Sequence, residues 1–166
     1  PEPLADFADL MIIGEGEETS DRYIELLRQD RGRDRRDHLR DAAAIPGVYV
    51  PSLSAAFDGG EAHAHPTPVS KQQRPDLADH VACSAIVTDR TEFSDLFLIE
   101  ISRGCPRHCR FCAVSYIYPK FRTVPAGRIL DIGSDCRARY GRDGRPGFDR
   151  VGLVSSAVCD YRETDA

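Results

Sequence analysis

The stretch Leu96-Phe-Leu-Ile-Glu-Ile101, followed closely by Gly104-Cys-Pro-Arg-His-Cys-Arg-Phe-Cys112, decides the fold class and the chemistry of this chain. The first part is a short, almost wholly apolar run, which is typical of a buried strand. The second part places three cysteines in a C-x3-C-x2-C pattern behind that strand. Three thiolates on one loop can hold three irons of a 4Fe-4S cluster, and no fourth cysteine follows at a short spacing to bind the last iron. The sequence therefore predicts a cluster with one iron open to chemistry.

A second strand is predicted beyond the cysteines. A helix is expected around residues 128–140, and Val151-Gly-Leu-Val154 is typical of another strand. A strand, a helix and a strand with a crossover of this length form a βαβ unit, which implies a parallel sheet. Ligand sites in α/β folds usually lie at the carboxyl ends of the strands, where the cysteine loop falls. The expected fold class is therefore α/β.

The cysteine spacing, the preceding strand and the aromatic Phe111 resemble the radical S-adenosylmethionine (radical SAM) enzymes. The resemblance implies that Cys105, Cys109 and Cys112 bind a 4Fe-4S cluster and that SAM chelates the fourth iron. In that family one electron from the reduced cluster breaks a carbon-sulfur bond of SAM, and the 5'-deoxyadenosyl radical abstracts hydrogen from a substrate. The resemblance thus implies an oxidoreductase fed by an electron donor such as flavodoxin or ferredoxin, with a substrate that the sequence does not name.

The same resemblance suggests further cofactor contacts. Phe111 is expected to pack near the SAM adenine, and the alternative is a loop aromatic folded into the core. Ser155 and Ser156 occupy the place where many family members carry a Gly-Gly-Glu segment that meets the SAM amino group. A backbone or hydroxyl contact is expected there. Glu100 lies in mid-strand between apolar residues and needs a partner, because burying an unpaired carboxylate is costly.

The N-terminal part carries a second resemblance. Met11-Ile-Ile-Gly-Glu-Gly-Glu-Glu18, followed by a helix and by Ile45-Pro-Gly-Val-Tyr-Val-Pro51, is similar to the junction in radical SAM proteins with an N-terminal cobalamin-binding-type domain. The implied architecture is the start of a radical SAM partial (β/α) barrel, preceded by the end of a Rossmann-like domain and a linker. The corrinoid motif D-x-H-x-x-G is absent from this chain, so cobalamin binding is left open.

Three parts are expected on these grounds. Residues 1–44 would end the Rossmann-like domain, residues 45–94 would be a linker, and residues 95–166 would begin the radical SAM domain. The first part is predicted to hold a strand at residues 9–14 and helices at residues 21–29 and 33–44. Within the linker, Asp58-Gly-Gly60 is a turn signal that could close a β-hairpin against residues 61–69.

Both ends of the chain suggest an internal piece of a longer protein. The chain opens without methionine and enters the apolar run Asp9-Leu-Met-Ile-Ile-Gly14 almost at once, as a lone strand without a sheet to join. It closes soon after the strand at residues 151–154. Two barrel strands alone leave apolar faces uncovered, so the isolated chain is expected to be inactive and prone to aggregation.

Two other functions are compatible with the motif. A methylthiotransferase-like radical SAM enzyme acting on RNA or protein would share it. A zinc-binding interaction module could combine the three cysteines with a histidine such as His108, since structural zinc is held by four cysteine or histidine ligands. Zinc ligands, however, usually come as two pairs separated by a longer insert. Cys83, Cys136 and Cys159 have no ligand spacing and are interpreted as small apolar residues.

The composition and charge of the chain limit the class of protein to which it can belong. The 166 residues are 41% hydrophobic and 30% charged, which is an ordinary globular composition. No apolar run reaches the roughly 18 residues of a membrane span. The net charge of -5 argues against a dedicated nucleic-acid binder. A cytoplasmic location is therefore expected.

Overall fold

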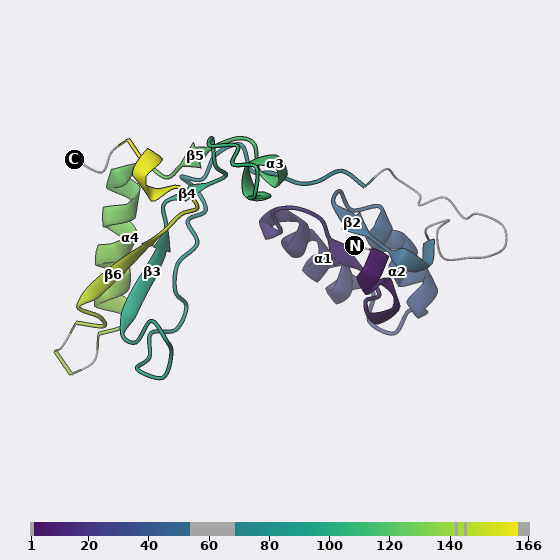
Figure 1. Cartoon of the computed structure of the whole chain (residues 1–166). Helices are drawn as coiled ribbons and strands as arrows, with labels where there is room; N and C mark the ends of the chain where they lie inside the picture. Colours follow the sequence, from purple (N-terminus) through teal and green to yellow (C-terminus); the bar gives the residue numbers. More distant parts are fainter. Residues whose placement is uncertain (1, 54–68, 142, 145, 163–166) are drawn as a thin grey trace. The chain divides into compact units, whose positions relative to one another are not determined.

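The computed structural model describes residues 2–53, 69–141, 143–144 and 146–162, and Figure 1 traces their path. The chain forms two compact units, residues 1–74 and residues 75–166. Among the described helices, none is long and apolar enough to cross a lipid bilayer. The hairpin predicted around Asp58 falls outside the described residues.

The first unit contains a small antiparallel sheet. Strand β1 (Met11–Ile12) pairs with strand β2 (Val48–Tyr49), and Met11 lies opposite Tyr49. The strand predicted at residues 9–14 therefore has a partner, and the expectation of a lone strand is wrong. A pairing across 38 residues leaves no local signal in the sequence. Short 3-10 turns flank the sheet, namely η1 (Glu2–Phe7) and η2 (Pro51–Leu53).

Two helices cover this small sheet. Helix α1 (Glu17–Gln29) begins before the predicted Asp21, because Glu17 and Glu18 lie inside its first turn, where carboxylates favour the positive end of the helix dipole. Helix α2 (Arg35–Ala43) is capped by Asp34, whose carboxylate accepts the backbone N–H of Arg36 at 2.8 Å. The helices and β2 enclose the core of the unit, whose buried residues are Leu39, Ala42, Ala43, Val48 and Val50.

The glycine of the predicted strand-turn-helix has a packing role. Gly14 has a φ of +105°, and a Cβ atom there would lie 2.2 Å from the carbonyl oxygen of Gln72. The chain returns past this point, since Gln72 N donates to Ile13 O and Glu15 N donates to Gln72 O, both at 3.0 Å. The Glu15 carboxylate also accepts the N–H of Arg74 at 2.8 Å. Residues 72–74 are thereby attached to the first unit.

The second unit is built on a parallel pair of strands. Strand β3 (Leu96–Glu100) pairs with strand β6 (Arg150–Val154), and helix α4 (Ala126–Arg139) lies between them in the sequence. The register runs from Leu96 opposite Arg150 to Glu100 opposite Val154. The predicted βαβ unit is confirmed. In the described residues the parallel sheet has these two strands, which is consistent with the α/β class and does not show a barrel.

The core of the second unit lies between β3 and α4. Phe97 and Ile99, which point to one face of β3, are fully buried, and the ring of Phe97 stacks on Phe148 with centroids 4.4 Å apart. Three α4 residues at helical spacing, and the residue that follows the helix, pack against them: Ile129, Ile132 and Cys136, with Tyr140. In contrast, Val151, Leu153 and Val154 of β6 are each close to half exposed. The predicted aggregation of the isolated chain is not tested and stays a prediction.

Candidate iron-sulfur site

The three cysteines lie on one loop that is closed at its base by two short strands. Strand β4 (Ser102–Arg103) follows β3 and pairs antiparallel with strand β5 (Arg122–Thr123). Between them the chain carries the cysteines and one helical turn, α3 (Val114–Ile117). Figure 1 shows this loop beyond the end of β3. Because β3 and β6 are parallel, the loop leaves the carboxyl end of the sheet, as the sequence predicts.

Gly104 determines how the loop begins. Its φ is +87°, and a Cβ atom there would lie 2.2 Å from the carbonyl oxygen of Lys120 and 2.8 Å from that of Tyr118. The next amide, that of Cys105, donates to Tyr118 O at 3.4 Å. Only glycine adopts this conformation and also leaves room for the returning chain. The backbone around the first cysteine is therefore set by a close approach of two chain segments.

The loop turns tightly between the cysteines. His108 has a φ of +48°, a left-handed conformation that is unfavourable for residues other than glycine. The amide of Cys112 then donates to Cys109 O at 3.0 Å, which closes a turn around the second and third cysteines. All three thiols are free and half-buried. The loop thus presents its sulfur atoms without crosslinking them.

This donor set fits an iron-sulfur cluster. Thiolates are the ligands that such clusters take in proteins. Each thiolate of a cubane binds a different iron, so the three sulfur atoms need not meet at one point. Among the described residues, no group of three or more His, Cys, Asp or Glu side chains is gathered to hold a metal ion. The assignment of Cys105, Cys109 and Cys112 as cluster ligands therefore stays a prediction.

Two serines join the end of β6 to the start of the loop. The Ser156 hydroxyl donates to the carbonyl oxygen of Gly104, next to Cys105. The Ser155 hydroxyl shares a hydrogen bond with the Ser102 hydroxyl and accepts the N–H of Ala157 at 2.9 Å. Both serines thus lie beside the cysteine loop, and their hydroxyls are engaged with protein groups. Their predicted contact with SAM is untested. The groups left to make it are the serine backbone groups and the remaining lone pairs of the hydroxyl oxygens.

An ion pair joins the cysteine loop to the segment after β6. The guanidinium of Arg107 donates to both carboxylate oxygens of Asp160 at 2.8 and 2.5 Å, and Asp160 ends the 3-10 turn η3 (Val158–Asp160). This hydrogen-bonded pair raises the pKa of Arg107, with smaller contributions in the same direction from the thiols of Cys105 and Cys159. A fixed positive charge therefore lies within electrostatic reach of the first cysteine.

Glu100 has the partner that the sequence does not name. Its two carboxylate oxygens accept three hydrogen bonds from the Arg103 guanidinium, at 2.8 to 2.9 Å. Both side chains are largely buried, with exposed fractions of 21% and 14%. A bidentate arginine-carboxylate pair of this kind is among the stronger side-chain contacts. It holds the bend between β3 and β4, at the base of the cysteine loop.

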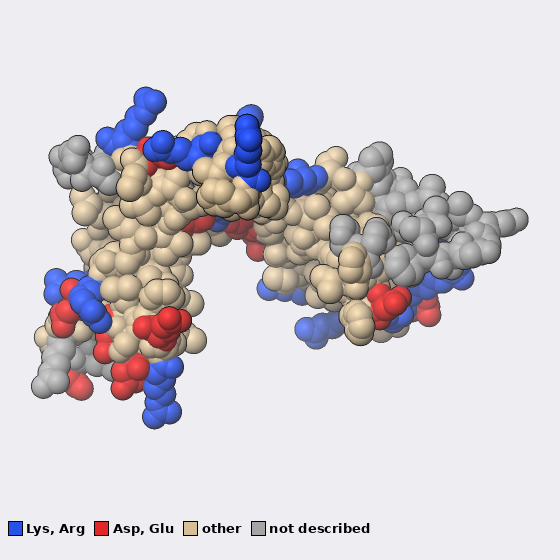
Figure 2. Space-filling model, viewed as in Figure 1, with Lys and Arg blue, Asp and Glu red and all other residues tan. Residues whose placement is uncertain are grey.

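The loop region is locally basic although the chain is acidic. Residues 101–130 include the cations Arg103, Arg107, Arg110, Lys120, Arg122 and Arg128, and no Asp or Glu. Figure 2 shows Lys and Arg side chains gathered over the end of the second unit that holds β4, β5 and α3 in Figure 1. Positive charge favours anionic ligands at this end.

The aromatic residues of the loop face outward. The Phe111 side chain is 94% exposed, so the alternative that it folds into the core is wrong. Its predicted place near the SAM adenine is untested. Tyr116 is also exposed, and its ring meets that of His108 edge-on with centroids 5.8 Å apart. The loop therefore offers an aromatic surface to solvent or to a ligand.

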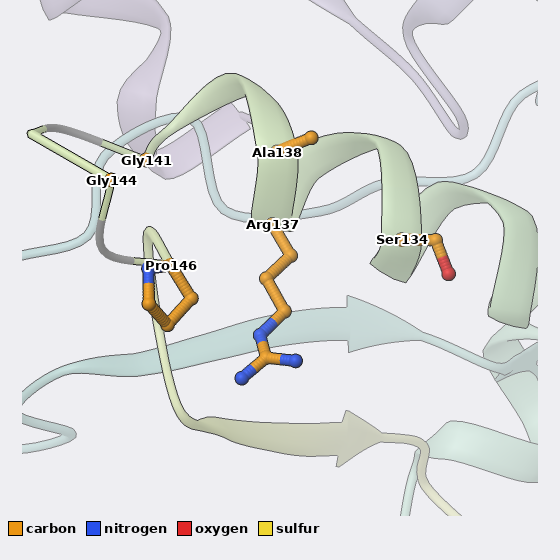
Figure 3. A pocket seen from close by; sticks show the side chains of 6 residues that line it. All are labelled: Ser134, Arg137, Ala138, Gly141, Gly144 and Pro146. Carbon is orange, nitrogen blue, oxygen red and sulfur yellow. The ribbon is translucent and has the colours of Figure 1, made fainter.

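Described residues of the second unit line cavities at its two ends. One, of about 320 Å³, is lined by residues in and just before β5 and by the segment after β6, namely Phe121, Thr123, Asp160, Tyr161 and Arg162. Its volume is at the lower end of the range for small-molecule sites, and its Asp160 is the partner of Arg107. The other, of about 580 Å³, lies at the far end of α4 (Figure 3). There Arg137 extends toward the strands and donates to Phe148 O at 3.2 Å.

Several of these contacts could not be found by sequence reasoning. Arg107 and Asp160 are 53 residues apart, and Ser156 and Gly104 are 52 apart, so no local spacing links them. Cys83 and Cys136, which the sequence treats as scattered, lie close enough for Cys136 to raise the pKa of Cys83. The basic character of the loop, in contrast, could have been predicted from the sequence, because residues 101–130 contain no Asp or Glu.

Comparison with known proteins adds an independent observation. Residues 1–51 match the family described as Radical SAM proteins, N-terminal. Over 162 residues the chain is 28% identical to an uncharacterized protein of Methanocaldococcus jannaschii, an alignment that covers 96% of this chain and 30% of that protein. The chain thus spans about a third of the length of this relative, and no solved structure matches it. The family match supports membership of the radical SAM superfamily.

Proposed function

We propose that this chain is part of a radical SAM enzyme in which Cys105, Cys109 and Cys112 hold a 4Fe-4S cluster. The support comes from two regions that do not overlap. The family match covers residues 1–51, in the first unit, whereas the cysteine motif lies in the second unit. The observation that carries the proposal is the position of the three free thiols on one loop at the carboxyl end of a parallel strand.

In this proposal the loop residues hold the cluster and leave one iron open. When bound and reduced, such a cluster supplies the electron that cleaves a carbon-sulfur bond of SAM. Gly104 and the pairing of β4 with β5 fix the base of the loop, and the contacts of Arg107 and Ser156 fix its position against the end of β6. The basic surroundings favour the carboxylate of SAM.

Phe111, Ser155 and Ser156 are the proposed SAM contacts. The exposed ring of Phe111 lies next to Cys112 and offers stacking area for a purine. Ser156 donates to the carbonyl oxygen of Gly104, next to Cys105, and Ser155 bonds to Ser102 at the base of the loop. Phe111→Ala is expected to weaken SAM binding and spare the cluster, because it removes stacking area and no ligand.

The proposal also covers the first unit. The resemblance of residues 11–18 to the junction of cobalamin-binding-type radical SAM proteins suggests that this unit ends such a domain. The motif that would hold the corrinoid is not part of this chain. The cobalt chemistry, if the full-length protein has it, therefore depends on residues outside this sequence. Methyl transfer from SAM and radical formation are distinguished by their products, S-adenosylhomocysteine and 5'-deoxyadenosine.

The first experiment measures metal content. Anaerobic reconstitution of the full-length protein is expected to give about four irons and about four sulfides per chain. Each of the substitutions Cys105→Ala, Cys109→Ala and Cys112→Ala should abolish the iron and sulfide content. Alanine at Cys159 is the matched control, since this thiol belongs to the same unit and lies outside the motif. Stoichiometric zinc without sulfide would refute the proposal and favour a zinc-binding module.

The second experiment tests the open iron. SAM added to the reduced protein should change its electron paramagnetic resonance spectrum in the absence of substrate. With a strong reductant the protein should slowly release methionine with 5'-deoxyadenosine, or S-adenosylhomocysteine if it transfers methyl groups. A loaded protein that shows neither a spectral change nor a product from SAM would be an electron carrier instead.

A further inference from the structure

A segment before β3 forms a third row beside the parallel pair. Ser84 N donates to Leu98 O at 2.9 Å, and Glu100 N donates to Ala82 O at 2.8 Å. Between these two bonds Cys83 lies directly opposite Ile99 in an antiparallel bridge. Residues 82–84 therefore follow the free edge of β3, on the side away from β6.

This register determines where the Cys83 side chain points. Residues that lie directly opposite each other in an antiparallel pair project to the same face of the sheet. Ile99 is fully buried in the core that α4 covers, and Cys136 of α4 packs against that core. Cys83 and Cys136 are accordingly placed on the same face at the edge of β3, where their thiols are close enough for Cys136 to raise the pKa of Cys83. Both are free cysteines, and Cys83 is exposed to solvent.

We propose that Cys83 and Cys136 are a dithiol pair that forms a reversible disulfide, fastening the segment before β3 to helix α4. The pair is separate from the cysteine loop, which lies beyond the end of β3. A bond between residues 83 and 136 closes a loop that includes β3, the cysteine loop and most of α4. Oxidation therefore ties together the elements that carry the iron-sulfur site, whether or not a cluster is bound.

The oxidant is a low-molecular-weight disulfide such as glutathione disulfide. One protein thiolate attacks this disulfide, forms a mixed disulfide and releases one thiol. The second protein thiolate then attacks the protein sulfur of the mixed disulfide and releases the second thiol. Two electrons pass from the protein to the oxidant, and the two protons end on the released thiols. Burial, and secondly Cys136, raise the pKa of Cys83, so the exchange is slow at neutral pH.

The test is a map of disulfides in the iron-free protein after oxidation with glutathione disulfide under native conditions. Arginines at 90, 128, 137 and 150 place Cys83, Cys136 and Cys159 in separate tryptic peptides. We expect a linked pair of the Cys83 and Cys136 peptides, 2 mass units lighter than the reduced pair, in at least about tenfold excess over any pair that contains Cys159. Cys159→Ser should keep this link, and dithiothreitol should remove it.

The denatured chain provides the matched reference. Cys136 is 53 residues from Cys83 and 23 from Cys159. In an unfolded chain the shorter loop closes more readily, by about 3.5-fold from loop-closure entropy. Oxidation in guanidinium should therefore favour the link between Cys136 and Cys159, and native oxidation should reverse that preference.

Two outcomes would overturn the proposal. One is a native map with the same preferences as the denatured one. The other is glutathione carried separately by Cys83 and Cys136 without a link between them. A second sample in which Cys105, Cys109 and Cys112 are all serine removes competition from the cysteine loop, and the wild-type sample guards against misfolding of that variant. Neither sample contains a cluster, so the result is independent of the proposed SAM chemistry.

Discussion

Substitution of Gly104 by alanine should open the base of the cysteine loop. Alanine in the left-handed conformation costs about 1–2 kcal/mol relative to glycine. In addition, the new Cβ atom would lie 2.2 Å from Lys120 O and 2.8 Å from Tyr118 O, and both are backbone carbonyl oxygens that no side-chain rotation can move away. The chain must then part at the bond from Cys105 N to Tyr118 O and at the pairing of β4 with β5, at about 1 kcal/mol per lost hydrogen bond. The total is about 3 kcal/mol.

Gly144 is the matched control for this substitution. It lies in the same unit with a φ of +75°, and a Cβ atom there meets nothing within 4 Å. Gly144→Ala therefore incurs only the conformational cost, and the difference of about 2 kcal/mol measures the close approach at Gly104. Hydrogen exchange of the Cys105 amide should be about 30-fold faster in Gly104→Ala than in Gly144→Ala. Equal exchange rates in the two variants would refute the reasoning.

Three further predictions concern stability. The pKa of Asp30 lies below its ordinary 3.8, because His38 and then Arg33 donate to its carboxylate, so the resulting stabilisation is present above pH 3.8 and is lost as the pH falls through the lower folded-state pKa. Asp30→Asn should therefore reduce the fall of the first unit's urea midpoint at acid pH, and equal pH dependence in the two proteins would contradict this. Tyr161→Phe removes a buried hydrogen bond of 2.6 Å to Val124 O and should lower the free energy of unfolding by about 1–3 kcal/mol in urea titrations, and a change within error would count against it. Gly133→Ala places a methyl group in open space within α4 and should raise the free energy of unfolding by up to about 1 kcal/mol, and the thermal midpoint with it. A lower thermal midpoint would contradict this.

The elements that the sequence predicts correctly are those with strong local patterns. The apolar run at residues 96–101 forms β3, and the helix and strand predicted after the cysteines are α4 and β6. Their parallel pairing follows from the length of the crossover, which a hairpin does not need. The boundary of α1 is less well predicted, because its acidic first turn resembles a loop that precedes a helix.

The sequence by itself determined the cysteine loop and its place behind a strand, because cysteine spacing within a few residues and a continuous apolar run are local properties. Only the tertiary structure decided what surrounds that loop. The contacts of Arg107 with Asp160 and of Ser156 with Gly104 join residues more than 50 apart. Such contacts, like the meeting of Cys83 with Cys136, exist only once α4 crosses back and β6 docks beside β3. Packing of distant segments leaves no periodic trace in the chain, since any arginine or cysteine in the sequence is equally able to make it.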